Sequence, residues 1–248
     1  MSTTTETEAS QIPLTLVAGG HSVTGKRASY EDRLLLAPEL RLFAVADGLG
    51  GHQNGATAAQ TCVDTLRSAI ERAGEPSADT MREAVELAHR AVRRLDVCRV
   101  TRTPYHKMSC HCQPPGTTLS AVWFKPRSVI VAHTGDCRVY RWRSVTGGPE
   151  VLTREHRLGS SLSQYVGRPY GELEVDVREF AIGPGHVLLV ASDGLWEPLE
   201  KLGARQAAIV EGDPAQRARN LVALVESSSD DNISALLVDV GSASEVDP

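Results

Sequence analysis

Two apolar runs in this chain end at the dipeptide Asp-Gly, and a third acidic position opens another apolar run. The three junctions are Asp47-Gly48 after residues 42–46, Asp193-Gly194 after residues 187–192, and Asp231-Asn232 before residues 233–238. Short apolar runs bounded in this way are typical of buried strands. Carboxylates at the ends of such strands can converge on one point, where a divalent cation offsets their mutual repulsion. The pattern therefore predicts a metal-dependent enzyme.

The composition is that of a globular protein and argues against several partners. Hydrophobic residues make up 41% of the 248 residues, charged residues make up 23%, and the net charge is −5. A negative chain is poorly suited to nucleic acid or to an anionic membrane surface. No stretch approaches the roughly 18 apolar residues that span a bilayer, and residues 1–11 lack the basic and apolar segments of a signal peptide. We therefore expect a cytoplasmic protein, with neither nucleic acid nor membrane as a partner.

The sequence predicts one domain. Residues 1–12 are rich in Thr, Glu and Ser, which predicts a disordered lead-in. No linker interrupts residues 13–241, and residues 242–248 form a short tail. The length suffices for one large domain with a full core. The five cysteines are odd in number and irregular in spacing, which favours reduced thiols over a disulfide framework.

The order of the expected elements indicates the fold class. Alternating and continuous apolar runs predict strands at residues 14–23, 33–37, 41–46, 117–124, 128–133, 139–143, 173–182, 187–192 and 233–240. Apolar residues at intervals of three and four predict helices at 56–73 and 78–97, and two more helices follow Asp193. Strands dominate both ends, with the helices in pairs between them. This order favours an α+β domain whose antiparallel sheets are covered by helix pairs.

The acidic residues point to a particular kind of metal. Asp47, Asp193, Asp231 and the pair Glu31-Asp32 supply carboxylates without interleaved Cys or His, a donor set that suits Mg²⁺ or Mn²⁺ rather than zinc. Gly48 would let a backbone carbonyl approach an ion, because no side chain stands in the way.

Arg27, four residues before Glu31, adds a guanidinium whose donors match two phosphate oxygens. Two ions about 3.5–4 Å apart can activate water for attack on phosphorus. A single Asp-Gly is more often a turn, and Arg27 alone is more often a solvated charge, so the combination carries the prediction.

Seven segments then make the chain recognisable. It resembles the metal-dependent Ser/Thr protein phosphatases of the PP2C (PPM) family, and is most similar to the bacterial branch. The matching segments lie in the family's order at residues 25–32, 45–52, 116–119, 133–138, 152–156, 191–196 and 231–234. Together they span about residues 17 to 240, nearly the whole chain.

The resemblance implies a central antiparallel β-sandwich flanked by helix pairs and a binuclear Mn²⁺ or Mg²⁺ centre. Asp47 would bridge both ions, and the carbonyl of Gly48 would bind one of them. Asp193 and Asp231 would complete the other, while Glu31 and Asp32 would act directly or through water. Asp136, with Asp193, would hold a weaker third ion, and Arg27 would bind the phosphate.

The implied reaction is hydrolysis of phosphoserine or phosphothreonine by metal-activated water, without a phosphoenzyme. Arg27, Asp47 and Asp193 would be the catalytic residues. The partners would be phosphorylated proteins, namely a Ser/Thr kinase or its substrates, and the enzyme would oppose a bacterial Ser/Thr kinase.

Several positions depart from the family's pattern. Leu49 stands where animal members carry a His proposed as the general acid, which leaves the proton donor for the leaving group unassigned. Glu155, Cys137 and Ser234 replace the more usual Asp, Ser and Thr. Only residues 156–167 are available for the family's mobile flap, so we expect a short or absent flap and a more open site.

Two other functions fit the same residues less well. A phosphatase of a partner-switching pathway shares the fold but usually brings sensory domains. A catalytically dead relative that binds phosphoproteins would have lost a metal ligand, whereas all expected ligands are present here. The loop 98–112 gathers Cys98, His106, Cys110, His111 and Cys112. A structural zinc there is conceivable, but the irregular spacing favours an ordinary loop.

Overall fold

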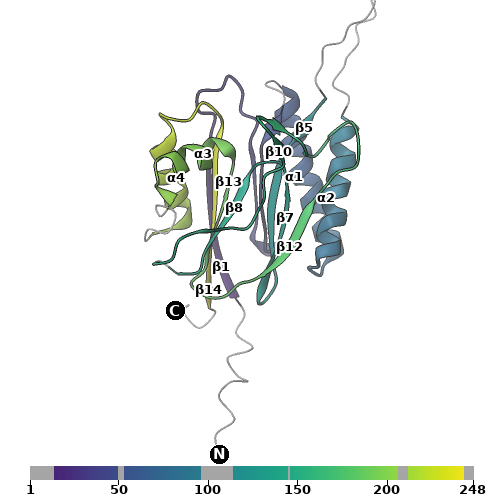
Figure 1. The fold of residues 1–248 in the computed structure, drawn as a ribbon. Helices are drawn as coiled ribbons and strands as arrows, with labels where there is room; N and C mark the ends of the chain where they lie inside the picture. Colours follow the sequence, from purple (N-terminus) through teal and green to yellow (C-terminus); the bar gives the residue numbers. More distant parts are fainter. Residues whose placement is uncertain (1–13, 50–52, 96–113, 145, 206–211, 243–248) are drawn as a thin grey trace, which may run out of the picture.

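Two five-stranded antiparallel sheets pack face to face, and a pair of helices covers the outer face of each (Figure 1). The structure is a computed structural model that describes residues 14–49, 53–95, 114–144, 146–205 and 212–242. The resulting four layers confirm the predicted sandwich flanked by helix pairs. The predicted lead-in, the predicted tail beyond residue 242 and the loop 98–112 lie outside the described residues.

In both sheets, strands that are distant in the sequence lie next to one another. The first sheet has the order β1 (Leu14–Val23), β14 (Ile233–Ser242), β13 (Val187–Ala191), β8 (Arg138–Trp142) and β9 (Glu150–Val151). The second has the order β12 (Asp176–Ala181), β7 (Ser128–Thr134), β6 (Leu119–Phe124), β3 (Leu42–Ala46) and β2 (Arg33–Ala37). All of their pairings are antiparallel.

Alternation along β3 explains why both faces of its sheet are buried. Leu42 and Ala44 pack in a cluster with the first helix pair, whereas Phe43 and Val45 pack against the other sheet. All five residues of β3 are fully buried. Successive side chains of a strand point to opposite faces, so a strand between a helix layer and a second sheet must be apolar throughout, as the run 42–46 is.

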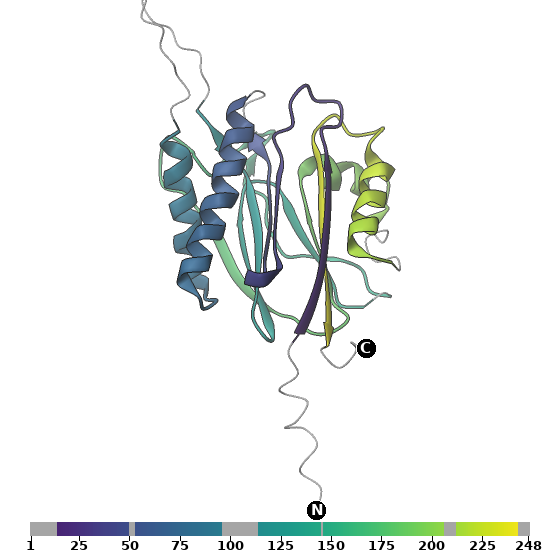
Figure 2. The same cartoon turned by 180° about the vertical axis from the view of Figure 1, so that it is seen from behind.

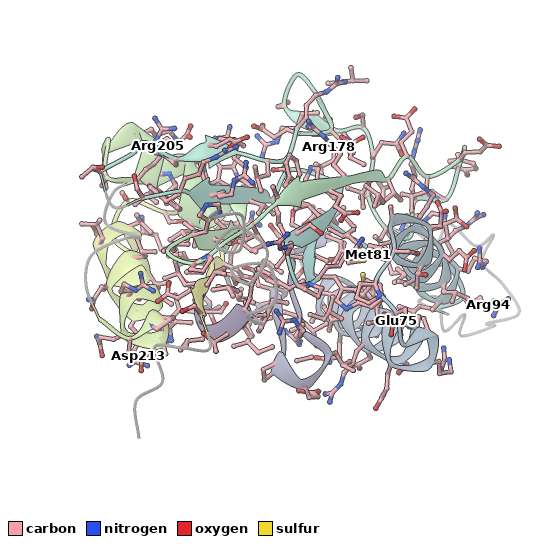
Figure 3. The ribbon with its side chains drawn as sticks, turned by 90° about the horizontal axis from the view of Figure 1, so that it is seen from below. Glu75, Met81, Arg94, Arg178, Arg205 and Asp213 are labelled. Carbon is pink, nitrogen blue, oxygen red and sulfur yellow. The ribbon has the colours of Figure 1, made fainter. Side chains whose placement is uncertain are left out.

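The helices cover the two outer faces. α1 (Gln53–Ala73) and α2 (Ala78–Arg93) lie over the second sheet, with fully buried Met81 on the inner side of α2 (Figure 3). The N-cap Ser77 accepts a hydrogen bond from Thr80 N at 3.0 Å, which satisfies one of the free donors at the start of α2.

α3 (Asp193–Lys201) and α4 (Pro214–Val225) cover the first sheet, and their apolar residues pack with Tyr140 and Trp142. Asp213 caps α4 by accepting from Ala215 N at 2.6 Å. None of the described helices is long and apolar enough to cross a membrane.

The pairing of β1 with β14 joins the two ends of the described chain (Figure 2). The ten-residue register places Val23 opposite Ile233. The loop that follows β1 therefore begins beside the segment that precedes β14. This pairing positions Arg27 and Glu31 near Asp231.

Most expected elements are found, with shifted ends. α1 begins at Gln53, three residues earlier than predicted, and α2 ends at Arg93 rather than at 97. The predicted strand 117–124 is divided into β5 (Gly116–Thr117) and β6, because Thr118 N donates to the carbonyl of Asp47 instead of continuing a strand. β12 covers residues 176–181 of the predicted 173–182.

Candidate active site

An open cavity of about 540 Å³ lies where the predicted acidic residues meet. Its lining includes seven of the eight predicted site residues, namely Arg27, Glu31, Asp47, Gly48, Asp136, Asp193 and Asp231. The eighth, Asp32, is fully buried and does not line the cavity. The fold therefore gathers into one place residues that are separated by up to 204 positions in the sequence.

Asp47 lies between β3 and the short strand β4 (Gly48–Leu49), and its backbone is held on both sides. Its carbonyl accepts hydrogen bonds from Thr118 N and Thr117 Oγ1, both at 2.8 Å. Its N–H donates to Thr118 Oγ1 at 3.2 Å. Burial raises the pKa of the Asp47 carboxyl, and the charges of neighbouring carboxylates, Asp32 first, raise it further.

Two glycines allow the backbone of this region to pack closely. A Cβ at Gly48 would lie 2.4 Å from the carbonyl oxygen of Gly55, and a Cβ at Gly55 would lie 1.9 Å from Glu31 Oε2. Only glycine fits at either position without displacement. Sequence reasoning identified Gly48 but missed Gly55, for which the sole signal is a glycine at the start of a predicted helical region.

Asn232 fixes the loop that carries Arg27 and Glu31. Its side-chain oxygen accepts from Glu31 N at 2.7 Å, and its nitrogen donates to the carbonyls of Thr24 and Ser29 at 2.7 and 3.0 Å. The amide is 3% exposed, so these bonds replace water contacts. The neighbour of the predicted ligand Asp231 is thus a positioning residue.

Asp32 and Asp193 each have a carboxylate oxygen without a partner among the described residues, Oδ1 in both cases. Asp32 Oδ2 accepts from Ser234 Oγ at 2.6 Å. Burial raises the pKa of Asp32 to about 6, although the Ser234 hydrogen bond opposes the shift. Burial also raises the pKa of Asp193 to about 7, and the charges of Asp136 and Asp231 act in the same direction. A buried carboxylate oxygen left unpaired is costly, and a hard cation is the type of group that would satisfy it.

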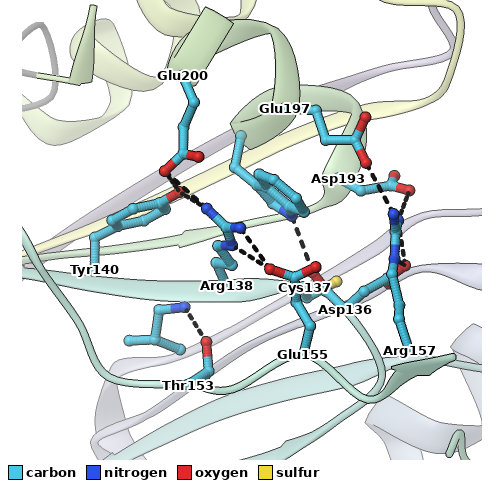
Figure 4. A network of polar contacts seen from close by, with 12 residues as sticks. Asp136, Cys137, Arg138, Tyr140, Thr153, Glu155, Arg157, Asp193, Glu197 and Glu200 are labelled. Atoms are coloured by element: carbon cyan, nitrogen blue, oxygen red, sulfur yellow. Dashed lines mark hydrogen bonds and ion pairs between the residues drawn. The ribbon is translucent and has the colours of Figure 1, made fainter. Parts of the chain in front are cut away.

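Two arginines neutralise part of the cluster. Arg27 Nη2 lies 2.5 Å from Asp231 Oδ2, and this hydrogen bond raises the pKa of Arg27 against the opposing effect of burial. Arg157, which sequence reasoning did not identify, contacts both Asp136 and Asp193 (Figure 4). No group of three or more His, Cys, Asp or Glu in the described ranges is arranged to hold an ion. Donor chemistry and the two unpartnered oxygens fit a hard divalent cation.

The departures from the family pattern have clear positions. Leu49 lines the cavity, so an aliphatic side chain stands where animal members carry the proposed acid. Glu155 lies 2.5 Å from Arg138 Nη2 and does not line the cavity (Figure 4). Cys137 Sγ lies 3.0 Å from Thr118 Oγ1, and Ser234 contacts Asp32 as described. Both small substitutions preserve polar contacts.

The flap is reduced to a hairpin of β10 (Arg157–Leu158) and β11 (Ser161–Leu162). Ser160, Ser161 and Leu162 of this hairpin line one wall of the cavity. The expectation of a short flap is therefore met within residues 156–167.

Comparisons with known proteins identify the family of this chain. The family model described as Protein phosphatase 2C matches residues 20–214. The serine/threonine protein phosphatase PstP of Mycobacterium tuberculosis is 26% identical over 235 residues, which cover 86% of this chain and 43% of that protein. The chain thus spans less than half the length of the curated relative.

Solved structures show the same fold. The catalytic domain of PstP in complex with two manganese ions superposes with a TM-score of 0.75 at 25% identity, covering 92% of this chain and 99% of that one. The phosphatase MsPP of Mycobacterium smegmatis, in complex with cacodylate, gives a TM-score of 0.72 at 28% identity, covering 90% and 98%. A sandwich of two sheets between helix pairs, with an acidic cavity at one end, defines a phosphatase-like domain. The chain belongs to the protein phosphatase 2C family.

Proposed function

We propose that this protein hydrolyses phosphoserine and phosphothreonine in proteins with the help of two divalent ions, Mn²⁺ or Mg²⁺. The observation that carries the proposal is the convergence of Asp47, Asp193 and Asp231 with Arg27 around one open cavity. The names of the relatives support the reaction class, and the two manganese ions in the PstP catalytic domain support the type of metal.

The chain offers a ligand for every predicted position of the binuclear centre. Asp47 and the carbonyl of Gly48 would hold one ion, with Asp47 also bridging to the second. Asp193 and Asp231 would complete the second, and Glu31 and Asp32 would support the pair directly or through water. Two such ions, when bound, lower the pKa of water and make it a nucleophile at neutral pH.

The remaining roles fall to the chain's own side chains. Arg27 would orient the phosphate, since its fork of donors matches two phosphate oxygens. The Arg27 side chain lines the cavity and is half exposed, so a phosphate can reach it. Leu49 cannot donate a proton to the leaving group. The short hairpin leaves the cavity open, which suits a phosphorylated segment of a folded protein.

We infer a role in signalling, with the enzyme opposing a bacterial Ser/Thr kinase in the cytoplasm by acting on the kinase or on its substrates. The net charge of −5 and the acidic cavity make nucleic acid an unsuitable partner. The partners would therefore be phosphorylated proteins.

The test is Mn²⁺-dependent release of phosphate from a phosphothreonine peptide, with the wild type beside Asp193→Asn. Loss of a residue that merely orients a metal ligand costs about 10–100-fold, so loss of a ligand should lower turnover by at least about 100-fold. Asp230→Asn is the matched control, because Asp230 adjoins the predicted ligand Asp231 but is an exposed residue paired with Lys26.

Circular dichroism should show that all three proteins are folded. Metal-dependent turnover that is lost only in Asp193→Asn supports the proposal. Absence of turnover in folded wild type with either ion contradicts it and favours a phosphoprotein-binding module.

A further inference from the structure

One guanidinium occupies the position at which a third ion is expected. Arg157 Nε donates to Asp136 Oδ2 at 2.7 Å, and Arg157 Nη2 lies 2.6 Å from the same oxygen. Nη2 also donates to Asp193 Oδ2, and Nη1 donates to Glu197 Oε1, both at 3.1 Å. All three nitrogens of the side chain are thus used, and Figure 4 shows Arg157 extending along the acidic group.

The backbone places Arg157 beside Asp136. His156 N donates to the carbonyl of Gly135 at 2.7 Å, and Gly135 N donates to His156 Nδ1 at 3.3 Å. The residue before Arg157 is therefore tied to the residue before Asp136. The short hairpin begins at Arg157. The two hydrogen bonds between His156 and Gly135 therefore direct the Arg157 side chain toward Asp136.

The environment favours a fixed cation here. The Asp136 side chain is 6% exposed and the Arg157 side chain 25%, so their ion pair is partly shielded from solvent. A planar guanidinium with several donors is the side chain best suited to bridge two carboxylates. Arg157 uses only Oδ2 of Asp193, and the buried Oδ1 has no partner in the described part of the chain. The arginine therefore leaves one oxygen of Asp193 for another cation.

We propose that Arg157 supplies the positive charge at the Asp136–Asp193 pair, so that this protein binds two divalent ions and excludes the third. This inference rests on the proposed binuclear centre. Arg157 acts as a positioning residue: it neutralises Asp136 and holds Asp193 with one oxygen turned to the arginine. An ion at the third position would have to displace a guanidinium that three carboxylates hold.

The test is the number of Mn²⁺ ions bound to the full chain, measured by equilibrium dialysis with metal analysis as the concentration of free Mn²⁺ rises. The wild type should saturate at two ions, and Arg157→Ala should bind a third with lower affinity. Adding Asp136→Asn to Arg157→Ala should remove the third ion. Arg154→Ala is the matched control, because Arg154 is an exposed arginine three residues earlier with no ion pair to the site among the described residues.

The outcomes separate this inference from the proposed function. Three ions in the wild type, or two in a folded Arg157→Ala, overturn the role of Arg157 while the binuclear centre stands. No ions in folded wild type overturn the binuclear centre itself, and with it the inference. Arg157→Lys provides a second variant that keeps a cation, and it should bind two ions if charge at this position excludes the third.

Discussion

Ser234 Oγ donates a 2.6 Å hydrogen bond to Asp32 Oδ2, although the two residues are 202 positions apart. Both side chains are fully buried. Ser234 N in turn donates to Ser192 Oγ at 3.0 Å, beside the start of α3. The hydroxyl therefore ties the Asp32 carboxylate to the two strand ends that carry Asp193 and Asp231.

Ser234→Ala should destabilise the protein and weaken Mn²⁺ binding. Removing one partner of a buried acceptor costs about 1–3 kcal/mol, and the unpaired Asp32 carboxylate would shift further toward its protonated form. Chemical denaturation and Mn²⁺ titration measure the two effects. Ser22→Ala is the control, since Ser22 Oγ lies 2.5 Å from Ser234 Oγ but makes no hydrogen bond to Asp32 among the described residues. Equal losses in both variants would show that the contact with Asp32 has no special role.

Gly55→Ala should lower activity because the new methyl group would collide with the Glu31 carboxylate, 1.9 Å from Oε2. In a helix, replacing glycine with alanine otherwise raises stability by up to about 1 kcal/mol. Helix propensity alone therefore predicts a gain in stability. A loss of both stability and turnover would show that the collision with Glu31 outweighs that gain. Gly183→Ala adds a methyl group in open space and should leave both quantities unchanged. Wild-type behaviour of Gly55→Ala would mean that Glu31 can move without cost.

The layered fold could be predicted because its causes are local. Apolar runs such as 42–46 and 187–191 mark strands buried on both faces, and the amphipathic pattern around Met81 and Val85 marks a helix. The Asp-Gly junctions placed the carboxylates at strand ends. What these patterns do not contain is the pairing of strands, which depends on side-chain contacts between distant segments.

The residues that sequence reasoning missed all act through the tertiary structure. Arg157 reaches Asp136 only because the hairpin after His156 is short and is tied to Gly135. Gly55 is required only because Glu31, from another loop, packs against the start of α1. Neither residue belongs to a spacing pattern within one segment, so no local signal indicates its role.

Binding of Mn²⁺ should release protons, and more of them at pH 6 than at pH 8. The pKa of metal-free Asp193 is raised to about 7 and that of Asp32 to about 6, in both cases mainly by burial. At pH 6 the cluster therefore carries protons that an ion must displace, whereas at pH 8 it is largely ionised. Apparent Mn²⁺ affinity should fall as pH drops from 8 to 6.

Calorimetry in buffers of different ionisation enthalpy counts the released protons. Raised carboxyl pKa values also mean that the metal-free fold binds more protons than the unfolded chain, so its stability should decrease as pH rises from about 4 to about 7. Asp193→Asn should release fewer protons at pH 6. A proton count that does not change with pH would contradict the raised pKa values.

Arg27→Ala should raise KM for a phosphothreonine peptide more than it lowers kcat, if Arg27 mainly binds the phosphate. A hydrogen bond to a charged group is worth about 1.5–3 kcal/mol, which corresponds to a loss of about 10- to 150-fold in kcat/KM. Lys26→Ala is the control: Lys26 pairs with exposed Asp230 one position away from the Arg27–Asp231 pair, and exposed pairs contribute little. Arg27→Lys keeps the charge but loses the fork of donors, so it should recover only part of the affinity. If Arg27→Ala instead leaves kcat/KM unchanged, the 2.5 Å contact with Asp231 is a structural ion pair, and another group binds the phosphate.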